Sequence, residues 1–223
     1  MKSFIRALGR EAESRAAALA TNRGGETATL YFGGGTPSML SDTHLGRLME
    51  TLDRLVPVDK LDEFSFEANP ATFTEKKVRF WRSLGMTRVS LGVQSLDSGI
   101  LHLLGREHTP AQALHSVEML KNAGMPHINM DLMFAIPGQT LSIWEATLKE
   151  AVRAGTDHIS AYNLTYEEDT EFFRSLLRGE KRQDPDEDAA YFELAEHMLE
   201  AAGMQHYETS NYAREGCLSP HNM

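Results

Sequence analysis

The sequence predicts an α/β fold built on a parallel sheet, either doubly wound or closed toward a barrel. Strand-like apolar runs alternate with helical stretches about five times, and each βα unit takes roughly 25–40 residues, the span of a crossover unit. Polar and glycine-rich residues follow directly after each strand-like run. In parallel α/β folds that carboxyl edge of the sheet holds the functional site.

The strands are predicted from β-branched and aromatic runs at residues 28–32, 63–67, 88–93, 127–133 and 158–163. The helices are predicted from apolar residues at helical spacing over residues 42–55, 74–84, 110–122 and 142–154. Thr74 is a predicted N-terminal cap, and Gly124 and Gly155 end two of the helices. Residues 1–20 have the apolar spacing of an amphipathic helix and no signal-peptide core.

The pattern changes after about Leu164, where an acidic stretch and a charged loop precede a predicted helix over 187–202 and one strand over 204–212. We therefore expect a barrel domain over residues 1–164 and the start of an α+β extension over 165–223. Whether the extension is a separate domain or a lid on the sheet is left open by the sequence.

Composition excludes several classes of protein. The chain has 223 residues, 41% of them hydrophobic, and a net charge of −10 without a basic stripe, which argues against binding nucleic acid. No apolar run reaches the roughly 20 residues that span a bilayer, so no transmembrane segment is expected and the predicted location is the cytoplasm. Cys217 is the sole cysteine, which excludes an internal disulfide and any metal site made of several cysteines.

Several polar residues at the carboxyl ends of predicted strands are candidates for ligand binding. Three glycines, 33–35, follow the first strand and suit either a tight turn or a backbone loop against a ligand. Glu67 and Gln94 end the next two strands, with Arg106 and His108 in the loop beyond. Each is equally compatible with a helix cap or a solvated strand end. Asp131 is the strongest candidate, because it interrupts a buried apolar strand where a charge needs a partner.

Further polar and aromatic residues gather later in the chain and include a lone histidine near its end. A lone histidine is more often structural than a ligand, and the eleven methionines are read as core filler. The residues are His158, Tyr162, Glu167 and Glu168 around the fifth strand, Tyr207, Glu208, Ser210, Asn211 and Tyr212 in one patch, and His221.

Eight short motifs follow one another along the chain: residues 33–38 (GGGTPS), 66–70 (FEANP), 91–95 (LGVQS), 104–108 (LGREH), 129–133 (NMDLM), 136–140 (IPGQT), 158–164 (HISAYNL) and 207–213 (YETSNYA). Taken together and in order, they resemble the oxygen-independent coproporphyrinogen III oxidase-like family of radical S-adenosylmethionine (SAM) proteins. The segment 219–222 (SPHN) is more similar to its haem-chaperone branch than to the oxidase itself. The resemblance implies a partial (β/α)6 TIM-like barrel of radical SAM type that holds SAM above a 4Fe–4S cluster.

The resemblance also implies roles for single residues. The loop positions Gly34, Gly35 and Thr36 match those that contact the methionine part of SAM. The other cofactor-contacting positions are matched by Glu67, Gln94, Arg106 and Asp131. A carboxylate such as Glu67 suits the ammonium group of SAM, Arg106 suits its carboxylate, and Gln94 and Asp131 suit ribose hydroxyls.

The sequence departs from the family at the cluster. The family's C-x-x-x-C-x-x-C loop follows its first strand, and no cysteine stands before Gly33 here. A single thiolate does not hold a 4Fe–4S cluster. We therefore expect the chain to be a fragment in which the first strand is missing, with the cluster present only in the full-length parent. The alternative is a natural relative that has lost the cluster. In either case no catalytic activity is expected in the chain as given.

Three functions follow from this reading. The first is a haem-binding chaperone with His221 as the axial-ligand candidate and Cys217 and Met223 as weaker ones, whose partners are haem and a haem-accepting protein. The alternative is an oxygen-independent coproporphyrinogen III oxidase acting on a porphyrinogen by radical chemistry in the complete protein. The third, an ordinary barrel enzyme for phosphorylated or carboxylated metabolites, lacks the basic loop residues it needs beyond Arg106.

Overall fold

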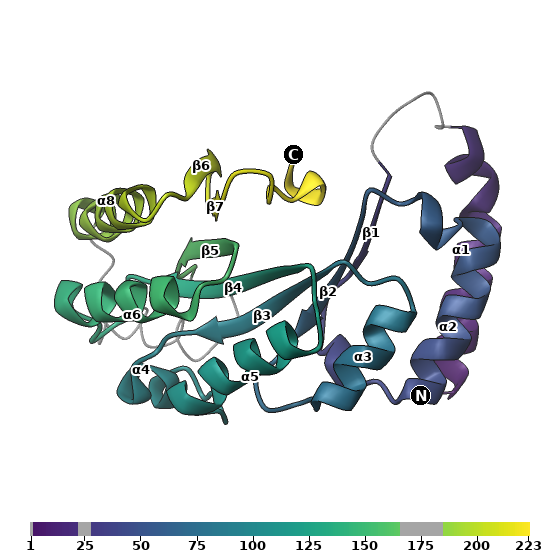
Figure 1. Cartoon of the computed structure of the whole chain (residues 1–223), viewed down its shortest axis with the longest axis horizontal. Coiled ribbons are helices and arrows are strands. Elements are labelled where there is room, and N and C mark those ends of the chain that lie inside the picture. The colour runs from purple at the N-terminus through teal and green to yellow at the C-terminus, as the bar shows by residue number, and fades with distance from the viewer. Residues whose placement is uncertain (1, 22–27, 166–184) are drawn as a thin grey trace.

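The computed structural model of the chain describes residues 2–21, 28–165 and 185–223, and Figure 1 labels their elements. Seven strands of this described part form one sheet, curled into a half-barrel, in the order β1-β2-β3-β4-β5-β7-β6. The first five are parallel, and β7 and β6 continue the sheet antiparallel. The strands are β1 (Thr29–Phe32), β2 (Glu63–Ala68), β3 (Arg88–Gln94), β4 (His127–Phe134), β5 (His158–Asn163), β6 (Gln205–Glu208) and β7 (Asn211–Ala213).

Helices connect successive parallel strands and lie on one face of the sheet (Figure 1). Five of them begin at a Ser, Thr or Asp side chain that accepts a hydrogen bond from the backbone three residues on, which satisfies a free N–H of the first turn. The helices are α1 (Lys2–Thr21), α2 (Asp42–Leu55), α3 (Glu75–Ser83), α4 (Ser98–Leu103), α5 (Pro110–Asn122), α6 (Leu141–Ala154) and α8 (Pro185–Ala201), with short 3-10 turns η1 (Pro37–Met39), η2 (Val58–Lys60) and η3 (Pro220–Asn222).

Strand residues alternate between the two faces of the sheet, and the alternation separates apolar from polar side chains. The apolar set faces the helices and forms the main core, with Phe64, Leu91 and Met130 fully or almost fully buried. The polar set lines the opposite, inner face of the half-barrel. The inner-face residues are Thr29, Tyr31, Glu63, Ser65, Glu67, Arg88, Ser90, Gln94, Asn129, Asp131, His158, Ser160 and Tyr162.

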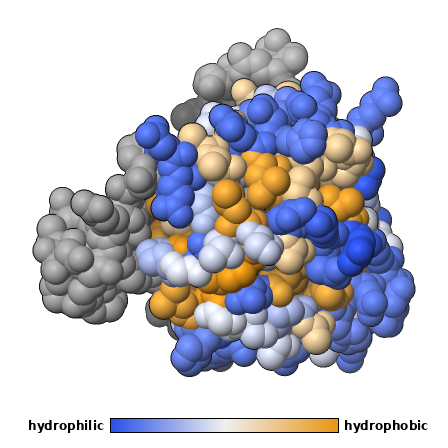
Figure 2. All heavy atoms as spheres, turned by 90° about the vertical axis from the view of Figure 1, so that its left-hand side faces the viewer, coloured by the Kyte–Doolittle hydropathy of each residue, from blue (hydrophilic) through white to orange (hydrophobic). Residues whose placement is uncertain are grey.

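The molecular surface carries a hydrophobic area at the end toward which β3 and β4 point. Seen from that end, hydrophobic atoms gather in the middle of the face and hydrophilic side chains surround them (Figure 2). A small second core of Ile100 from α4, Ile136 and Leu164 lies beyond the strand ends and packs against Leu104, Met133 and Ile143.

A C-terminal strap, residues 214–223, crosses from β7 back to β1 (Figure 1). It begins where the Arg214 backbone N–H donates to the carbonyl of Asp157 and ends where His221 contacts Thr29. The strap therefore links the β5–β7 side of the curled sheet to its edge strand β1.

A buried ion pair beneath the strap holds it against the sheet. Arg88 Nε lies 2.6 Å from Glu63 Oε2, and both side chains are at most 4% exposed. Arg88 Nη2 also donates to the carbonyls of Cys217 and Leu218, at 3.0 and 3.1 Å. Glu63 Oε1 accepts from the hydroxyls of Ser65 and Ser219. Burial raises the pKa of Glu63, but the charge of Arg88 and the hydrogen bonds from Ser219, Ser65 and Arg88 together lower it more. The pKa of Glu63 therefore lies below its usual value, and the carboxylate stays ionised.

The α/β partial barrel is confirmed, and the predicted strands and helices over residues 28–163 are present to within two residues at each end. One element is wrong: the strand predicted over 204–212 is a hairpin, because residues 209–210 form a tight turn that splits it into β6 and β7. Helix α4 was not predicted, since six residues are too short to show a period.

The division at residue 164 stays a prediction, and β7 pairs directly with β5 across it. Glu167 and Glu168 lie outside the described residues. Among the helices that the structure describes, none combines the length and hydropathy that crossing a membrane requires.

Replacing Arg88 with Met is expected to lower the free energy of unfolding by about 3–5 kcal/mol, because it leaves the buried Glu63 carboxylate without its counter-charge. Urea denaturation followed by circular dichroism measures the loss. The matched control is Arg79→Met, which breaks an exposed i,i+4 pair with Glu75 on α3 and is expected to change stability by at most about 1 kcal/mol. Equal losses in the two variants would contradict the central place of the Glu63–Arg88 pair.

Candidate functional site

A cavity of about 360 Å³ opens at the carboxyl ends of the parallel strands. Every one of the five parallel strands contributes to its wall, so the curl of the sheet makes the cavity. Such a position is where parallel α/β folds bind their ligands. The lining residues are Tyr31, Glu67, Gln94, Asp131, Met133, Tyr162, Asn163 and Thr165.

Glu67 joins this cavity to the glycine loop. Its Oε1 accepts a 2.6 Å hydrogen bond from the Tyr31 hydroxyl, and its Oε2 accepts a 3.0 Å bond from the backbone N–H of Gly34. Burial and the bond to Glu67 raise the pKa of Tyr31 well above its usual value, so the phenol stays a donor. A Cβ at Gly33 would lie 2.3 Å from the Tyr31 ring, which explains why glycine is needed there.

Gly34 and Gly35 have positive φ angles, and a Cβ on either would meet no described atom within 4 Å. The loop therefore exposes its backbone to open space beside the carboxylate. Gly35 and Thr36 line a neighbouring groove of about 780 Å³ between α1 and β1, together with Gly33 and Gly34. The loop thus lies between this groove and the cavity.

Asp131 is held by polar neighbours on the inner face. The Ser90 hydroxyl lies 3.0 and 2.9 Å from its two carboxylate oxygens, and Asn129 Nδ2 donates to Oδ1 at 2.7 Å. Burial nevertheless raises the pKa of Asp131 to about 7. The hydrogen bonds from Ser90 and Asn129 lower this pKa, and the charge of Glu67 raises it by less than either bond lowers it. Asp131 therefore changes its charge near neutral pH.

The hydrogen bonds continue from Asp131 to the strap. Asn129 Oδ1 lies 2.7 Å from His158 Nδ1, and His158 Nε2 lies 2.7 Å from the Tyr207 hydroxyl. A neutral imidazole protonated on Nδ1 satisfies both contacts. Burial lowers the pKa of His158 to about 4, which keeps it in that form. The Tyr207 hydroxyl in turn accepts from the backbone N–H of Ser219 at 3.3 Å, so His158 and Tyr207 have a structural place in this network.

Gln94 and Arg106 differ in how they approach the cavity. Gln94 lines it from a strained backbone position, with φ of +68° beside a shift in the β3–β4 register. Arg106 is half-buried beyond α4 and does not line the cavity. In the described part of the chain its guanidinium has no hydrogen-bond partner. Burial lowers the pKa of Arg106, while the carboxylate of Asp131 acts in the opposite direction.

His221 lies on the inner face next to the cavity wall. Its ring stacks on that of Tyr31 with centroids 4.4 Å apart and an angle of 5° between planes. Its Nδ1 lies 3.2 Å from Thr29 Oγ1. Because Tyr31 also donates to Glu67, a single side chain separates His221 from the cavity carboxylate.

The structure thus brings Glu67, Gln94 and Asp131 to one cavity and places Gly34 beside it, whereas Arg106 and His221 lie just outside. Sequence reasoning missed Tyr31, Ser90 and Asn129. The available signal was the polar alternation along β3 and β4, where the inward-facing residues are polar except for Gly92 and Met133.

The residues of this chain do not fit a 4Fe–4S cluster. Such clusters are usually held by several cysteine thiolates. Cys217 is the sole cysteine and lies in the strap near His127 and Asp157, which stand at the amino ends of β4 and β5, far from the carboxyl-end cavity along the strands.

Comparison with known proteins gives a consistent result. The Radical SAM superfamily profile matches residues 9–151. The chain is 36% identical over 197 residues to "Heme chaperone HemW" of Bacillus subtilis, covering 87% of this chain and 52% of that protein, and 35% identical to the Escherichia coli protein of the same name, covering 90% and 52%. The chain therefore spans about half the length of the curated relatives it matches.

Two solved structures show the same fold. The coproporphyrinogen III oxidase HemN of Escherichia coli, described as a radical SAM enzyme, superposes with a TM-score of 0.82 at 24% identity, over 96% of this chain and 49% of that one. The archaeal Elp3 of Methanocaldococcus infernus superposes with a TM-score of 0.64 at 22% identity, over 89% and 48%. At these identities the superpositions establish the fold alone.

The stability contributed by Asp131 is expected to fall as pH rises from about 4 to about 7 and to stay lost at higher pH. A carboxyl whose pKa is raised by folding stabilises the folded state fully below its unfolded pKa of about 4 and loses that contribution as pH passes its folded pKa. Urea denaturation between about pH 5 and pH 9 measures the effect, expected to be on the order of a few kcal/mol.

The control is Asp131→Asn, which keeps the shape of the side chain and cannot ionise. Because the folded pKa of His158 is about 4, below its unfolded value of about 6.5, His158 makes stability rise from about pH 4 to about pH 6.5 in both proteins and opposes Asp131 in the wild type. Subtracting the pH profile of the variant from that of the wild type therefore isolates Asp131. Parallel pH profiles for wild type and variant would show that Asp131 titrates elsewhere.

Proposed function

The chain belongs to the radical SAM superfamily, and from that premise we propose that its carboxyl-end cavity and glycine loop bind SAM in a haem-binding chaperone of the HemW type. The observation that carries the proposal is the convergence of Glu67, Gln94 and Asp131, from three neighbouring strands, on one cavity next to the exposed backbone of Gly34. All of these residues lie inside the segment that matches the superfamily.

The chemistry of SAM suits this wall. SAM carries an ammonium group, a carboxylate, a sulfonium cation and a ribose. Glu67, fixed from two sides by Tyr31 and Gly34, offers a carboxylate for the ammonium group. Gln94 and Asp131 offer hydrogen bonds to hydroxyls. The Arg106 guanidinium, which has no hydrogen-bond partner among the residues that the structure describes, would take the carboxylate, and the loop of Gly34, Gly35 and Thr36 would lie along the methionine part.

When bound, SAM would supply a sulfonium group, and its one-electron reduction would give a carbon-centred radical. The residues present hold no iron–sulfur cluster, so no radical step is assigned to them. The part of the mechanism that belongs to this chain is binding: the carboxylates orient the cation, the loop covers one side, and Asp131 takes up or releases a proton near neutral pH.

Haem binding is the second part of the proposal, with His221 as the axial ligand. Thr29 engages Nδ1 and the Tyr31 ring holds the imidazole plane, an arrangement that orients a histidine so that Nε2 faces a metal. His221 is exposed, so haem iron can reach it. The "Heme chaperone HemW" relatives support this choice, and a chaperone requires a haem-accepting protein as its partner.

An oxygen-independent coproporphyrinogen III oxidase is the alternative. Its support is the HemN fold, which does not determine function. An assay for decarboxylation of coproporphyrinogen III in the presence of SAM and an electron donor, run beside a haem-transfer assay, separates the two. Turnover would favour the oxidase, and haem transfer without turnover favours the chaperone.

Replacing Glu67 with Gln, or Asp131 with Asn, is expected to weaken SAM binding by about 10–100-fold, the effect of losing one charge-assisted contact. Binding by the wild-type chain is expected to tighten as pH rises through about 7, because ionised Asp131 attracts the sulfonium cation. Isothermal titration calorimetry with SAM across this pH range measures both. Glu75→Gln on the surface of α3 is the control and should bind as wild type does. Unchanged affinity in both cavity variants would remove the SAM assignment.

Replacing His221 with Ala is expected to remove the histidine-ligated haem spectrum and to weaken haem binding by at least about tenfold, the loss of one iron ligand. Absorption spectra during haem titration provide the measurement. His115→Ala, a change at an exposed histidine on α5, is the control and should leave the spectrum unchanged. Identical spectra for wild type and His221→Ala would assign the axial position to another residue.

A further inference from the structure

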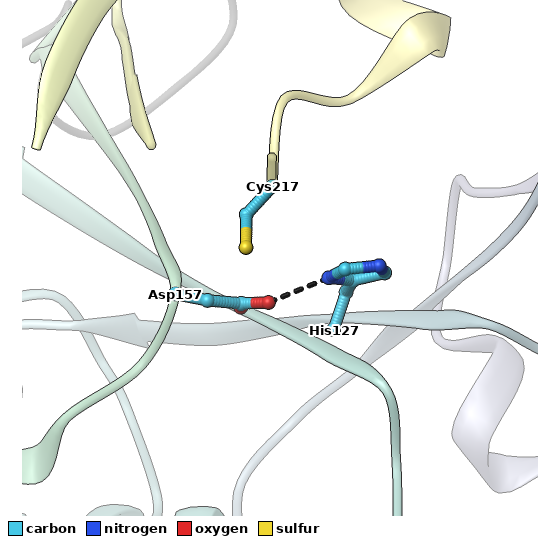
Figure 3. A group of neighbouring side chains, drawn as sticks. All are labelled: His127, Asp157 and Cys217. Carbon is cyan, nitrogen blue, oxygen red and sulfur yellow. Dashed lines mark hydrogen bonds and ion pairs between the residues drawn. The ribbon is translucent and has the colours of Figure 1, made fainter. Parts of the chain in front are cut away.

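Three metal-binding side chains meet at the amino ends of β4 and β5, the opposite end of the strands from the cavity. They are His127, the first residue of β4, Asp157, directly before β5, and Cys217 in the strap. Their ligand atoms all lie within 4.8 Å of one another. Figure 3 shows the Cys217 sulfur directed down toward Asp157, with the His127 ring to the right of the carboxylate and hydrogen-bonded to it.

We propose that His127 Nδ1, an Asp157 carboxylate oxygen and Cys217 Sγ bind a divalent transition-metal ion of the zinc class. One imidazole, one carboxylate and one thiolate are a donor set that zinc accepts, and they leave a fourth, open position for water. The soft thiolate disfavours magnesium and calcium, which prefer oxygen ligands.

The distances are compatible with such an ion after small side-chain movements. Ligands of a tetrahedral zinc ion lie about 3.3–3.8 Å apart, as zinc–ligand bonds of about 2.0–2.3 Å require. His127 Nδ1 and Asp157 Oδ2 are 2.6 Å apart and would have to separate, while the sulfur lies within 4.8 Å of both ligand atoms. The His127 and Asp157 side chains are 33% and 20% exposed and Cys217 is half-buried, so all three have room to move.

Neighbouring groups orient two of the ligands. Asp157 Oδ1 accepts a 2.8 Å hydrogen bond from the backbone N–H of Ile128, which leaves Oδ2 for the ion. The turn that carries Cys217 is fixed by its N–H to the carbonyl of Arg214 and by Arg88, which donates to the Cys217 carbonyl. Outer contacts of this kind raise metal affinity by holding the ligands in place.

Without an ion, hydrogen bonds from His127 and Cys217 to Asp157 hold the three side chains together. Although burial opposes it, hydrogen bonds from His127 and from the Ile128 N–H lower the pKa of Asp157. Burial, the charge of Asp157 and a hydrogen bond to it raise the pKa of the Cys217 thiol. Binding then moves the imidazole proton to Nε2 and releases the thiol proton, so one proton leaves for each divalent ion that forms a metal–sulfur bond.

The position of the site gives the ion a structural consequence. Two ligands belong to the sheet and the third belongs to the strap, so the ion joins the strap to the ends of β4 and β5. The strap is the segment that carries His221 to Thr29. A bound ion would therefore fix the strap at a second point, after the contacts of Arg88.

Titration of the chain with Co²⁺ under a non-thiol reductant tests the proposal. Because Cys217 is the sole cysteine, a thiolate-to-cobalt charge-transfer band can come from this residue alone. The expected spectrum has that band at one equivalent, together with the visible bands of four-coordinate cobalt. Saturation at one equivalent without the charge-transfer band, or no saturable binding, overturns the proposal.

Competition between the chain and a chromophoric chelator for Zn²⁺ gives the affinities. Cys217→Ser and His127→Gln are expected to raise the Kd by at least about 100-fold, and both keep the neighbouring backbone contacts. The control is His115→Gln, which alters an exposed histidine paired with Glu118 and should change the Kd by less than about threefold. Circular dichroism confirms that each variant is folded. Equal Zn²⁺ affinity in wild type and Cys217→Ser overturns the proposal as surely as the missing band.

Amide hydrogen exchange reports on the strap. Zn²⁺ is expected to slow exchange in residues 214–222 of the wild type and to leave the Cys217→Ser variant unchanged. Binding that leaves exchange in the strap unaltered would remove the structural role assigned to the ion.

Discussion

The buried ion pair between Glu63 and Arg88 is the interaction on which the inner face depends. Arg88 is shared by three segments, because it pairs with β2, starts β3 and donates to two carbonyls of the strap. The strap is thereby held across the half-barrel, and its residues reach Tyr207, Glu63 and Thr29. Since buried charges are tolerated only when paired and hydrogen-bonded, these contacts specify the path of the strap as well as stabilise it.

The polar inner face gives one sheet two chemically different ends. At the carboxyl end, Glu67 and Asp131 form an acidic wall beside the glycine loop, which suits a cation with hydroxyl groups. At the amino end, a thiol, an imidazole and a carboxylate meet under the strap, which suits a transition-metal ion. A chain of hydrogen bonds runs from Asp131 through Asn129, His158 and Tyr207 to Ser219 of the strap, which also carries Cys217. Ligands at either end thus act on one connected structure.

The fold was largely predictable because each strand and helix carries its own period, and Asp131 was predictable because a charge inside an apolar strand requires partners. The strand pairing that brings Glu67, Gln94 and Asp131 together followed from the parallel topology. What the sequence could not supply were contacts between distant segments. Nothing near His221 predicts its stacking on Tyr31, and nothing near Cys217 predicts Asp157 beside it, since both depend on the course of the strap. The hairpin of β6 and β7 was missed because its two-residue turn lacks glycine and proline.

A crystal structure of the chain grown with SAM tests the central claim most directly, since the carboxyl-end cavity and the groove between α1 and β1 both lie next to the glycine loop. The account predicts density in the carboxyl-end cavity, with the amino group of SAM at Glu67, its ribose at Gln94 and Asp131, and the glycine loop along its methionine part. Density in the larger groove between α1 and β1, away from Glu67 and Asp131, would contradict it.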